Sequence, residues 1–215
     1  MIKLQSFIVR SDELTRSEFY DYWLNEHVPL AKDLAGLRRY RTALPVEPFM
    51  SRYDGVAELY FDTIEAFESA LGPESNTPAI NDVDNFENRT DRCLVTETVR
   101  YDERTEGSPV KLVAVLSRRD NVRHNAFVDG CFNDETFEQV PGLRKFTTAV
   151  PVAADVSYDG VIECYFDGVD ELHAAMIPDD ADSTLEAIDL PFDTSLVGSV
   201  DSHVVRETVQ LDNIA

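Results

Sequence analysis

The sequence predicts an α+β protein made of two tandem copies of one βαββαβ unit, because long motifs recur at a nearly constant distance. The segment GLRRYRTALPV that begins at Gly36 returns as GLRKFTTAVPV at Gly142, an offset of 106 residues. YDGVAELYFD at Tyr53 returns as YDGVIECYFD at Tyr158, an offset of 105 residues. Two matches at nearly the same spacing indicate a duplication, with one ferredoxin-like unit in each half.

The boundary between the repeats is predicted in the polar segment DERTEGSP, which contains Gly and Pro. We therefore assign a first repeat, with the candidate site, to residues 1–105 and a degenerate second repeat to residues 106–215. In the first repeat, apolar patterning and turn residues predict strands at 2–9, 37–46, 53–62 and 92–101, and helices from residue 16, at 63–71 and at 77–86.

The first helix has clear start and stop signals. Thr15 followed by Glu18 has the form of a capping box, and Gly36 is a typical residue just beyond a helix end. The strand at 53–62 carries apolar residues at both parities, so both faces of its sheet should be buried. Helices can cover one face and a second sheet the other. The predicted fold is two βαββαβ repeats packed sheet to sheet, a single-chain pseudo-dimeric α+β barrel.

The charge is strongly acidic, with 41 Asp and Glu against 19 Lys and Arg, and only four of the basic residues are lysine. This acidic, lysine-poor composition is typical of halophilic proteins, and an ordinary acidic cytosolic protein is the alternative. Without a basic stripe, nucleic acid and anionic membranes are poor partners. Three separated cysteines, no signal-like N-terminus and no apolar run of membrane-spanning length predict a cytoplasmic location.

The stretch most suggestive of chemistry is FYDYWLNEHVPLAKDLAGLRRY, which holds Trp23, the only tryptophan, and His27. Four residues apart, these two side chains lie on one helical face. Pro29 should bend or break the helix near 26–28, push Val28 out of helical angles and turn His27 inward. His27 is then either a general acid or base, or a structural residue that bonds the freed backbone.

The run YW…H.P at Tyr22, Trp23, His27 and Pro29, followed by GLRRY, resembles the EthD group, named for an ethyl tert-butyl ether degradation protein. The resemblance implies a dimeric α+β-barrel fold. It also implies an apolar pocket for a small hydrophobic or aromatic molecule, commonly without a metal or organic cofactor.

An enzyme of this kind would be a cofactor-independent oxygenase, isomerase or cyclase, with His27 as acid or base. Tyr22, Trp23 and Tyr40 would shape the pocket, and Arg39 would hold a ligand carboxylate or neutralise nearby acids. The alternatives are a non-catalytic ligand-binding or stress-related module and, more weakly, a haem-binding barrel. Whether two internal pseudo-dimers associate further stays open.

Glu58 lies mid-strand between apolar neighbours, as does its counterpart Glu163. A carboxylate there needs a partner, so we expect an ion pair with Arg39 or Arg41, or a substrate-facing catalytic acid.

The second repeat keeps the strands but lacks the candidate site. Trp23 aligns with Asp129 or Cys131, and His27 with Asn133 or Glu135. Gly130 within the second helix suggests a supporting role for this copy.

The excess of acidic residues makes stability depend on salt. At about 1 M salt the Debye length is about 3 Å, so we expect the unfolding midpoint to rise steeply between low-salt buffer and 1 M KCl. Thermal unfolding followed by circular dichroism measures this. Cooperative folding that is equally stable at low ionic strength would count against halophilic adaptation.

Overall fold

The computed structural model describes residues 1–49, 51–103, 109–132, 137–153, 156–178, 181–182 and 184–213. The first repeat contains β1 (Ile2–Arg10), α1 (Arg16–Tyr22), η1 (Trp23–His27), α2 (Val28–Lys32), β2 (Leu37–Pro45), β3 (Gly55–Phe61), α3 (Ile64–Leu71), α4 (Pro78–Asp82), η2 (Val83–Asn85) and β4 (Glu87–Asp102). The second contains β5 (Val110–Arg118), α5 (His124–Cys131), β6 (Lys145–Pro151), β7 (Gly160–Phe166), α7 (Val169–Met176), η3 (Leu185–Ala187), η4 (Thr194–Leu196) and β8 (Val197–Asp212).

The sheet confirms the predicted fold class. Its hydrogen-bonded strands follow one closed order, β1-β3-β2-β8-β5-β7-β6-β4, so the chain forms an eight-stranded α+β barrel from two βαββαβ halves. The ladders between neighbouring strands are antiparallel, for example between β1 and β3 and between β5 and β7. Among the described residues, no helix is long and apolar enough to cross a membrane.

Two compact units can be distinguished by their internal contacts, and they do not coincide with the two halves of the sequence. Unit 1 comprises Met1–Leu44, Arg52–Leu94 and the segment from Thr208 onward, whereas unit 2 comprises Pro45–Ser51 and Val95–Glu207. The long strands β4 and β8 are therefore divided between the units. The predicted repeat boundary at 105/106 lies outside the described residues and stays a prediction.

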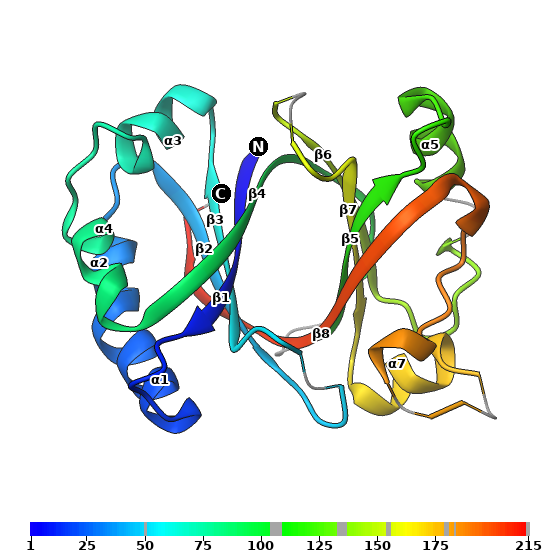
Figure 1. Cartoon of the computed structure of the whole chain (residues 1–215), viewed down its shortest axis with the longest axis horizontal. Helices are drawn as coiled ribbons and strands as arrows, with labels where there is room; N and C mark the ends of the chain where they lie inside the picture. The colour runs from blue at the N-terminus through cyan, green and yellow to red at the C-terminus, as the bar shows by residue number, and fades with distance from the viewer. Residues whose placement is uncertain are drawn as a thin grey trace. The chain divides into compact units, whose positions relative to one another are not determined.

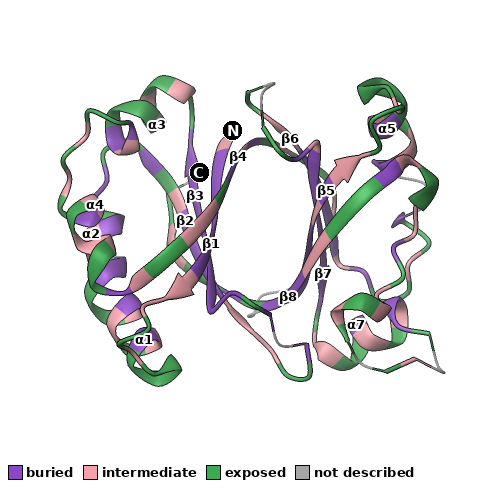
Figure 2. Cartoon of the chain, viewed as in Figure 1, coloured by how far each residue is buried: buried purple, intermediate pink, exposed green. Residues whose placement is uncertain are grey.

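In unit 1, helices α1 to α4 cover one face of the sheet, as Figure 1 shows. Strand alternation points Leu4, Ala57 and Leu59 toward these helices, where they join one apolar core. The opposite parity carries Gln5 and Glu58, which are also buried. Burial of both faces, as predicted, is visible in the uniformly buried strand β3 in Figure 2.

The repeated Tyr-Asp-Gly motif has a structural explanation in each unit. Asp54 accepts hydrogen bonds from the Arg10 backbone N–H and from the Arg16 guanidinium at 3.1 Å each. Asp159 does the same for the backbone N–H and the guanidinium of Arg118, at 2.8 Å each. The aspartate thus ties the end of the first strand of each unit to the start of the third. The same tie is therefore present in both copies.

The glycine of the motif makes room for an aromatic ring. A Cβ atom on Gly55 would lie 2.6 Å from Cζ3 of Trp23, and one on Gly160 would lie 2.4 Å from Cζ of Phe132. By this packing, Phe132 is the spatial counterpart of Trp23, so the alignment of Trp23 with Asp129 or Cys131 was wrong.

The first helix is continuous where a break was predicted. Thr15 and Glu18 form the expected capping box, and α1 then passes into η1, a five-residue π-helical turn. The Val28 N–H bonds the carbonyl of Trp23 five residues back, and Val28 keeps helical angles (φ −55°, ψ −42°). The predicted displacement of Val28 was therefore wrong. The wider turn absorbs Pro29, which lies in the first turn of α2, where its missing N–H costs no hydrogen bond.

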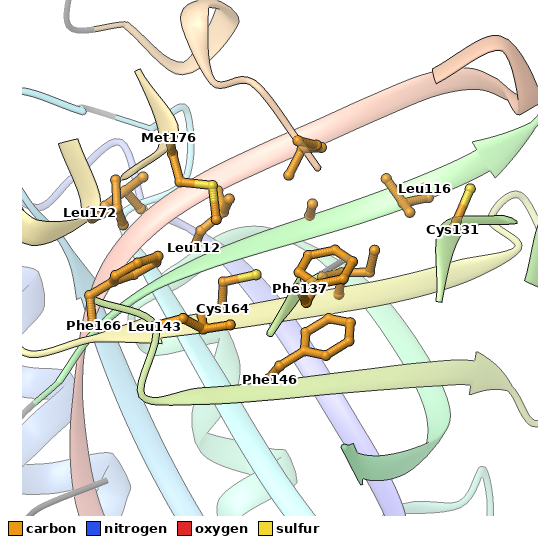
Figure 3. Close-up of a cluster of buried hydrophobic side chains, with 14 of the residues drawn as sticks. Leu112, Leu116, Cys131, Phe137, Leu143, Phe146, Cys164, Phe166, Leu172 and Met176 are labelled. Atoms are coloured by element: carbon orange, nitrogen blue, oxygen red, sulfur yellow. The ribbon is translucent and has the colours of Figure 1, made fainter. Parts of the chain in front are cut away.

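Unit 2 has its own apolar core. Figure 3 shows Phe137 beside Phe146 in its apolar core, and the two rings stack with centroids 3.8 Å apart and an interplanar angle of 13°. Gly130 in α5 leaves space for Leu196, whose Cδ1 would lie 2.2 Å from a Cβ there. This glycine therefore has a packing function, which explains its place in the helix without any loss of structure.

The contact between Gly55 and Trp23 can be tested by substitution. Gly55→Ala should lower the free energy of unfolding by about 1–3 kcal/mol, because the added methyl group overpacks the indole. Chemical denaturation measures the change. Gly168→Ala is the control, since its Cβ would meet only the carboxylate end of Glu171, and we expect a loss of no more than about 1 kcal/mol, from the poorer N-cap of α7. Equal effects at the two positions would contradict the tight contact.

Candidate active site

Unit 1 contains a cavity of about 480 Å³ between the helical layer and the sheet face that carries Leu4 and Leu59. This size lies within the usual range for small-molecule sites. Its walls are mainly aliphatic and aromatic, with a few polar groups. The residues that line the cavity include His27, Trp23, Ala31, Tyr40, Phe86, Glu87 and Arg92.

His27 reaches this cavity from the π-helical turn η1. Its Nδ1 atom lies 2.9 Å from Oδ2 of Asp82, at the end of α4. Its ring lies 4.5 Å from the ring of Phe86, centroid to centroid. The histidine is thus held between a carboxylate and an aromatic ring, and 9% of the residue remains exposed. When Nδ1–H donates to Asp82, Nε2 is the ring nitrogen with a free lone pair.

Asp82 is itself fixed by two further hydrogen bonds. The Tyr22 hydroxyl donates to Oδ1 at 2.7 Å, and the Asn85 amide donates to the same atom at 2.9 Å. Burial alone would raise the pKa of Asp82, but the hydrogen bonds from Tyr22, Asn85 and His27 outweigh it and lower the pKa. Asp82 is therefore a carboxylate at neutral pH.

Burial lowers the pKa of His27 below its usual value, and Asp82 and Glu87 oppose this effect without cancelling it. The imidazole is consequently neutral near pH 7. A neutral imidazole oriented through Nδ1 by a carboxylate can accept a proton at Nε2. The arrangement is a neutral imidazole oriented by a carboxylate at the wall of a mainly apolar cavity.

Trp23 and Tyr40 also line the cavity, as expected for pocket residues. Trp23 is fully buried, and Tyr40 is 1% exposed. Burial raises the pKa of the Tyr40 phenol, so it stays protonated, and the nearby Trp23 N–H only partly opposes this. The structure thus brings together three of the predicted site residues, His27, Trp23 and Tyr40.

Tyr22 is not a wall of the cavity but supports it indirectly through Asp82. Arg39 pairs with Asp212 at 3.1 Å and lies over the ring of Tyr60, so its guanidinium is engaged away from the cavity lining. The interpretation that this arginine neutralises a neighbouring acid fits this contact better than a role in holding a ligand carboxylate.

Glu58 faces the opposite side of the sheet from the cavity. Its carboxylate accepts hydrogen bonds from Gln5 at 2.7 Å and from the Tyr60 hydroxyl at 3.3 Å, and Lys3 Nζ is 4.0 Å away. Arg41 lies directly across the ladder from Glu58, whereas Arg39 is paired with Asp212. The geometry separates Glu58 from His27 and favours the structural interpretation of this residue.

Asp82 and Phe86 were missed by the sequence analysis. The segment PAINDVDNF has no motif that identifies one of its acids as a histidine partner. Only the fold of α4 and η2 over the first helix brings Asp82 to His27. Among the described residues, no group of three or more His, Cys, Asp or Glu side chains is placed to hold a metal ion.

The described residues of unit 2 differ from those of unit 1 at the corresponding place. Phe132 occupies the position of Trp23, and Phe146 is the motif counterpart of Tyr40. Phe137 stacks on Phe146 there, with ring centroids 3.8 Å apart. The predicted counterparts of His27, Asn133 and Glu135, lie outside the described residues.

Residues 11–90 match the model of the EthD domain, which confirms the predicted resemblance for the segment that carries His27 and Asp82. No curated protein sequence matches the chain significantly. Solved structures match over nearly the whole chain.

An anthrone oxidase-like protein aligns with a TM-score of 0.65 and 11% identity over 100% of this chain and 94% of its own. A predicted monooxygenase from Lactobacillus acidophilus NCFM aligns with a TM-score of 0.57 and 12% identity, over 99% of this chain and 95% of its own. A chlorite dismutase from Candidatus Nitrospira defluvii, in complex with imidazole, aligns with a TM-score of 0.58 and 6% identity, over 96% of this chain and 90% of its own. At these identities the likeness shows the fold alone.

The protonation of His27 can be measured directly by NMR. We expect a pKa below about 6.5, the ordinary value for histidine, with Nδ1 protonated in the neutral form. Asp82→Asn should lower the pKa further, because it removes the charge that favours imidazolium. His27→Ala assigns the signal among the four histidines.

The same shift makes folding depend on pH. The unfolded chain binds this proton more readily, so stability should fall as the pH drops through about 6.5 toward the folded pKa. A pKa above the ordinary value, or an increase in Asp82→Asn, would contradict the described environment.

Proposed function

We propose that the first-repeat cavity binds a small apolar or aromatic molecule and that the His27–Asp82 pair removes a proton from it. The observation that carries this proposal is the 2.9 Å contact between His27 Nδ1 and Asp82 Oδ2 at the wall of a cavity of about 480 Å³. The EthD match over the same residues and the fold likeness to an anthrone oxidase-like protein and a predicted monooxygenase support it.

The chemistry follows from the state of each group. Asp82 holds the imidazole by Nδ1, so Nε2 is left to take a proton from a C–H or O–H group beside an aromatic ring. The apolar walls exclude water, which would otherwise solvate the ring nitrogen and weaken its orientation. The bond electrons remain on the ligand as a conjugated anion. Removal of such a proton is a common first step of oxygenation, isomerisation and cyclisation.

Proton abstraction can be tested with 1-tetralone, an aryl ketone with acidic α-protons. In D₂O, the protein should catalyse exchange of these protons, followed by proton NMR. The proton moves from carbon to His27 Nε2, the electron pair moves onto the ketone oxygen, and a deuteron returns to carbon. Removal of a general base should lower the exchange rate by about 10²-fold or more in His27→Ala. Asp82→Asn should lower it by about tenfold or more.

His124→Asn is the matched control, because His124 is a half-exposed histidine at the start of α5, outside the cavity. The His124→Asn variant should catalyse exchange at the same rate as the unaltered protein. If 1-tetralone binds but its protons do not exchange, and His27→Ala changes nothing, the proposal of an enzyme is wrong. The protein would then be a ligand-binding module.

A haem-binding barrel is the second candidate, because an axial histidine also uses Nε2 while Nδ1–H donates to a carboxylate. His27 and Asp82 would supply these two groups, and bound haem would supply one-electron or oxygen chemistry. Hemin titration separates the candidates: a Soret band that His27→Ala abolishes would favour haem over proton abstraction.

A further inference from the structure

We infer that the Trp23 indole N–H and the Tyr40 hydroxyl form a hydrogen-bonding subsite in the cavity that holds an acceptor oxygen of the ligand. The ligand class is an aromatic molecule with a ring-conjugated carbonyl or phenolate oxygen. This inference rests on the proposed function and names the substrate class for the same site.

The first observation is the state of the indole. Phe19 stacks near Trp23 with centroids 5.4 Å apart and an interplanar angle of 21°. The Cζ3 and Cη2 edge of the ring lies against Gly55. The Nε1 atom, on the other side of the indole, is buried without a hydrogen-bond partner among the described residues. A buried donor with no acceptor is costly, so a ligand oxygen here would relieve that cost.

The second observation is the neighbouring phenol. Tyr40 comes from β2, lines the same cavity and is almost fully buried. The Trp23 N–H lies near the Tyr40 oxygen without the geometry of a hydrogen bond, and it lowers the pKa of the phenol less than burial raises it. The hydroxyl therefore stays protonated and can donate. Two donors are thus neighbours on the lining of a mainly apolar cavity, an arrangement that stabilises negative charge on an oxygen.

The third observation is the second unit, which acts as an internal comparison. There, Phe132 packs on Gly160 as Trp23 packs on Gly55. Phe146 stands where the motif has Tyr40, and it stacks with Phe137. Phenylalanine therefore occupies both positions in the second unit. The polar atoms of Trp23 and Tyr40 have no counterpart there, and they occur in the unit that carries His27.

The subsite and His27 would act on different atoms of the ligand. The two donors hold the ligand oxygen, and His27 Nε2 takes a proton from the atom that feeds charge to that oxygen. A hydrocarbon of the same shape would leave the indole N–H unpaired. Since a site built to bond an oxygen discriminates against the analogue that lacks it, we expect selectivity for the oxygenated ligand.

The test compares 1-tetralone with tetralin, which differ only by the carbonyl oxygen. Binding is followed by methyl NMR of Leu4, Ala31 and Ala57 at the cavity wall, because this readout does not depend on the tryptophan. The unaltered protein should bind 1-tetralone about tenfold more tightly than tetralin, the effect of one good hydrogen bond.

Trp23→Phe and Tyr40→Phe should each reduce this preference toward equality while tetralin affinity changes little. Tyr101→Phe is the matched control, because it removes a half-buried phenol in unit 2 and should leave the preference intact.

The outcomes separate the two proposals. Equal affinity of the unaltered protein for both ligands, or a preference that survives in Trp23→Phe and Tyr40→Phe, would overturn the subsite but leave the cavity and His27 in place. Failure to bind either ligand would overturn the proposed function, and the subsite with it. Loss of α-proton exchange in Trp23→Phe at saturating 1-tetralone would support the subsite further, because a purely structural role would not alter the bound reaction.

Discussion

The candidate site depends on how closely one helix approaches one strand. Gly55 has no side chain, so the Trp23 indole can lie directly on the backbone of β3. This contact sets the depth of the helix that begins at Arg16. The π-helical turn that follows then sets the direction of His27, because the wider turn places His27 and Pro29 without a break. Opposite it, the short helix α4 brings Asp82 within hydrogen-bonding distance. Close packing on one side of Trp23 and open space on the other are thus parts of the same arrangement.

The duplication shows how such a space is opened or closed with little change of fold. Both units keep the aspartate tie and the glycine under an aromatic ring. In unit 2, phenylalanines stand at the positions of Trp23 and Tyr40, and one of them stacks on Phe137 at 3.8 Å. Close packing of this kind favours stability, whereas a cavity such as that beside His27 is a local cost. The two units thus differ in side chains at this place while they share the same framework.

Much of the fold could be predicted because its signals are local or repeated. The capping box at Thr15, the alternation in β3 and the duplicated motifs each report on short segments. The family resemblance pointed to His27 and Trp23, and both line the cavity. Asp82 could not be predicted, since its role arises from the packing of residues 55 positions apart in the sequence. The continuity of the helix at Pro29 was also missed, because neither proline nor the residue types beside it indicate a π-helical turn.

The division of β8 between the units has a consequence for the order in which the protein can be assembled. Gln210 bonds Thr42 at 2.9 Å, Asp212 pairs with Arg39, and the Asn213 N–H bonds the carbonyl of Arg38. The strand beside β2 is therefore supplied from much later in the sequence, since Gln210 follows Thr42 by 168 positions. During synthesis, the N-terminal unit cannot finish its sheet when its own first 94 residues have emerged, although domains usually fold in that order. The half that carries the candidate site is complete only after the second repeat and β8 have been made.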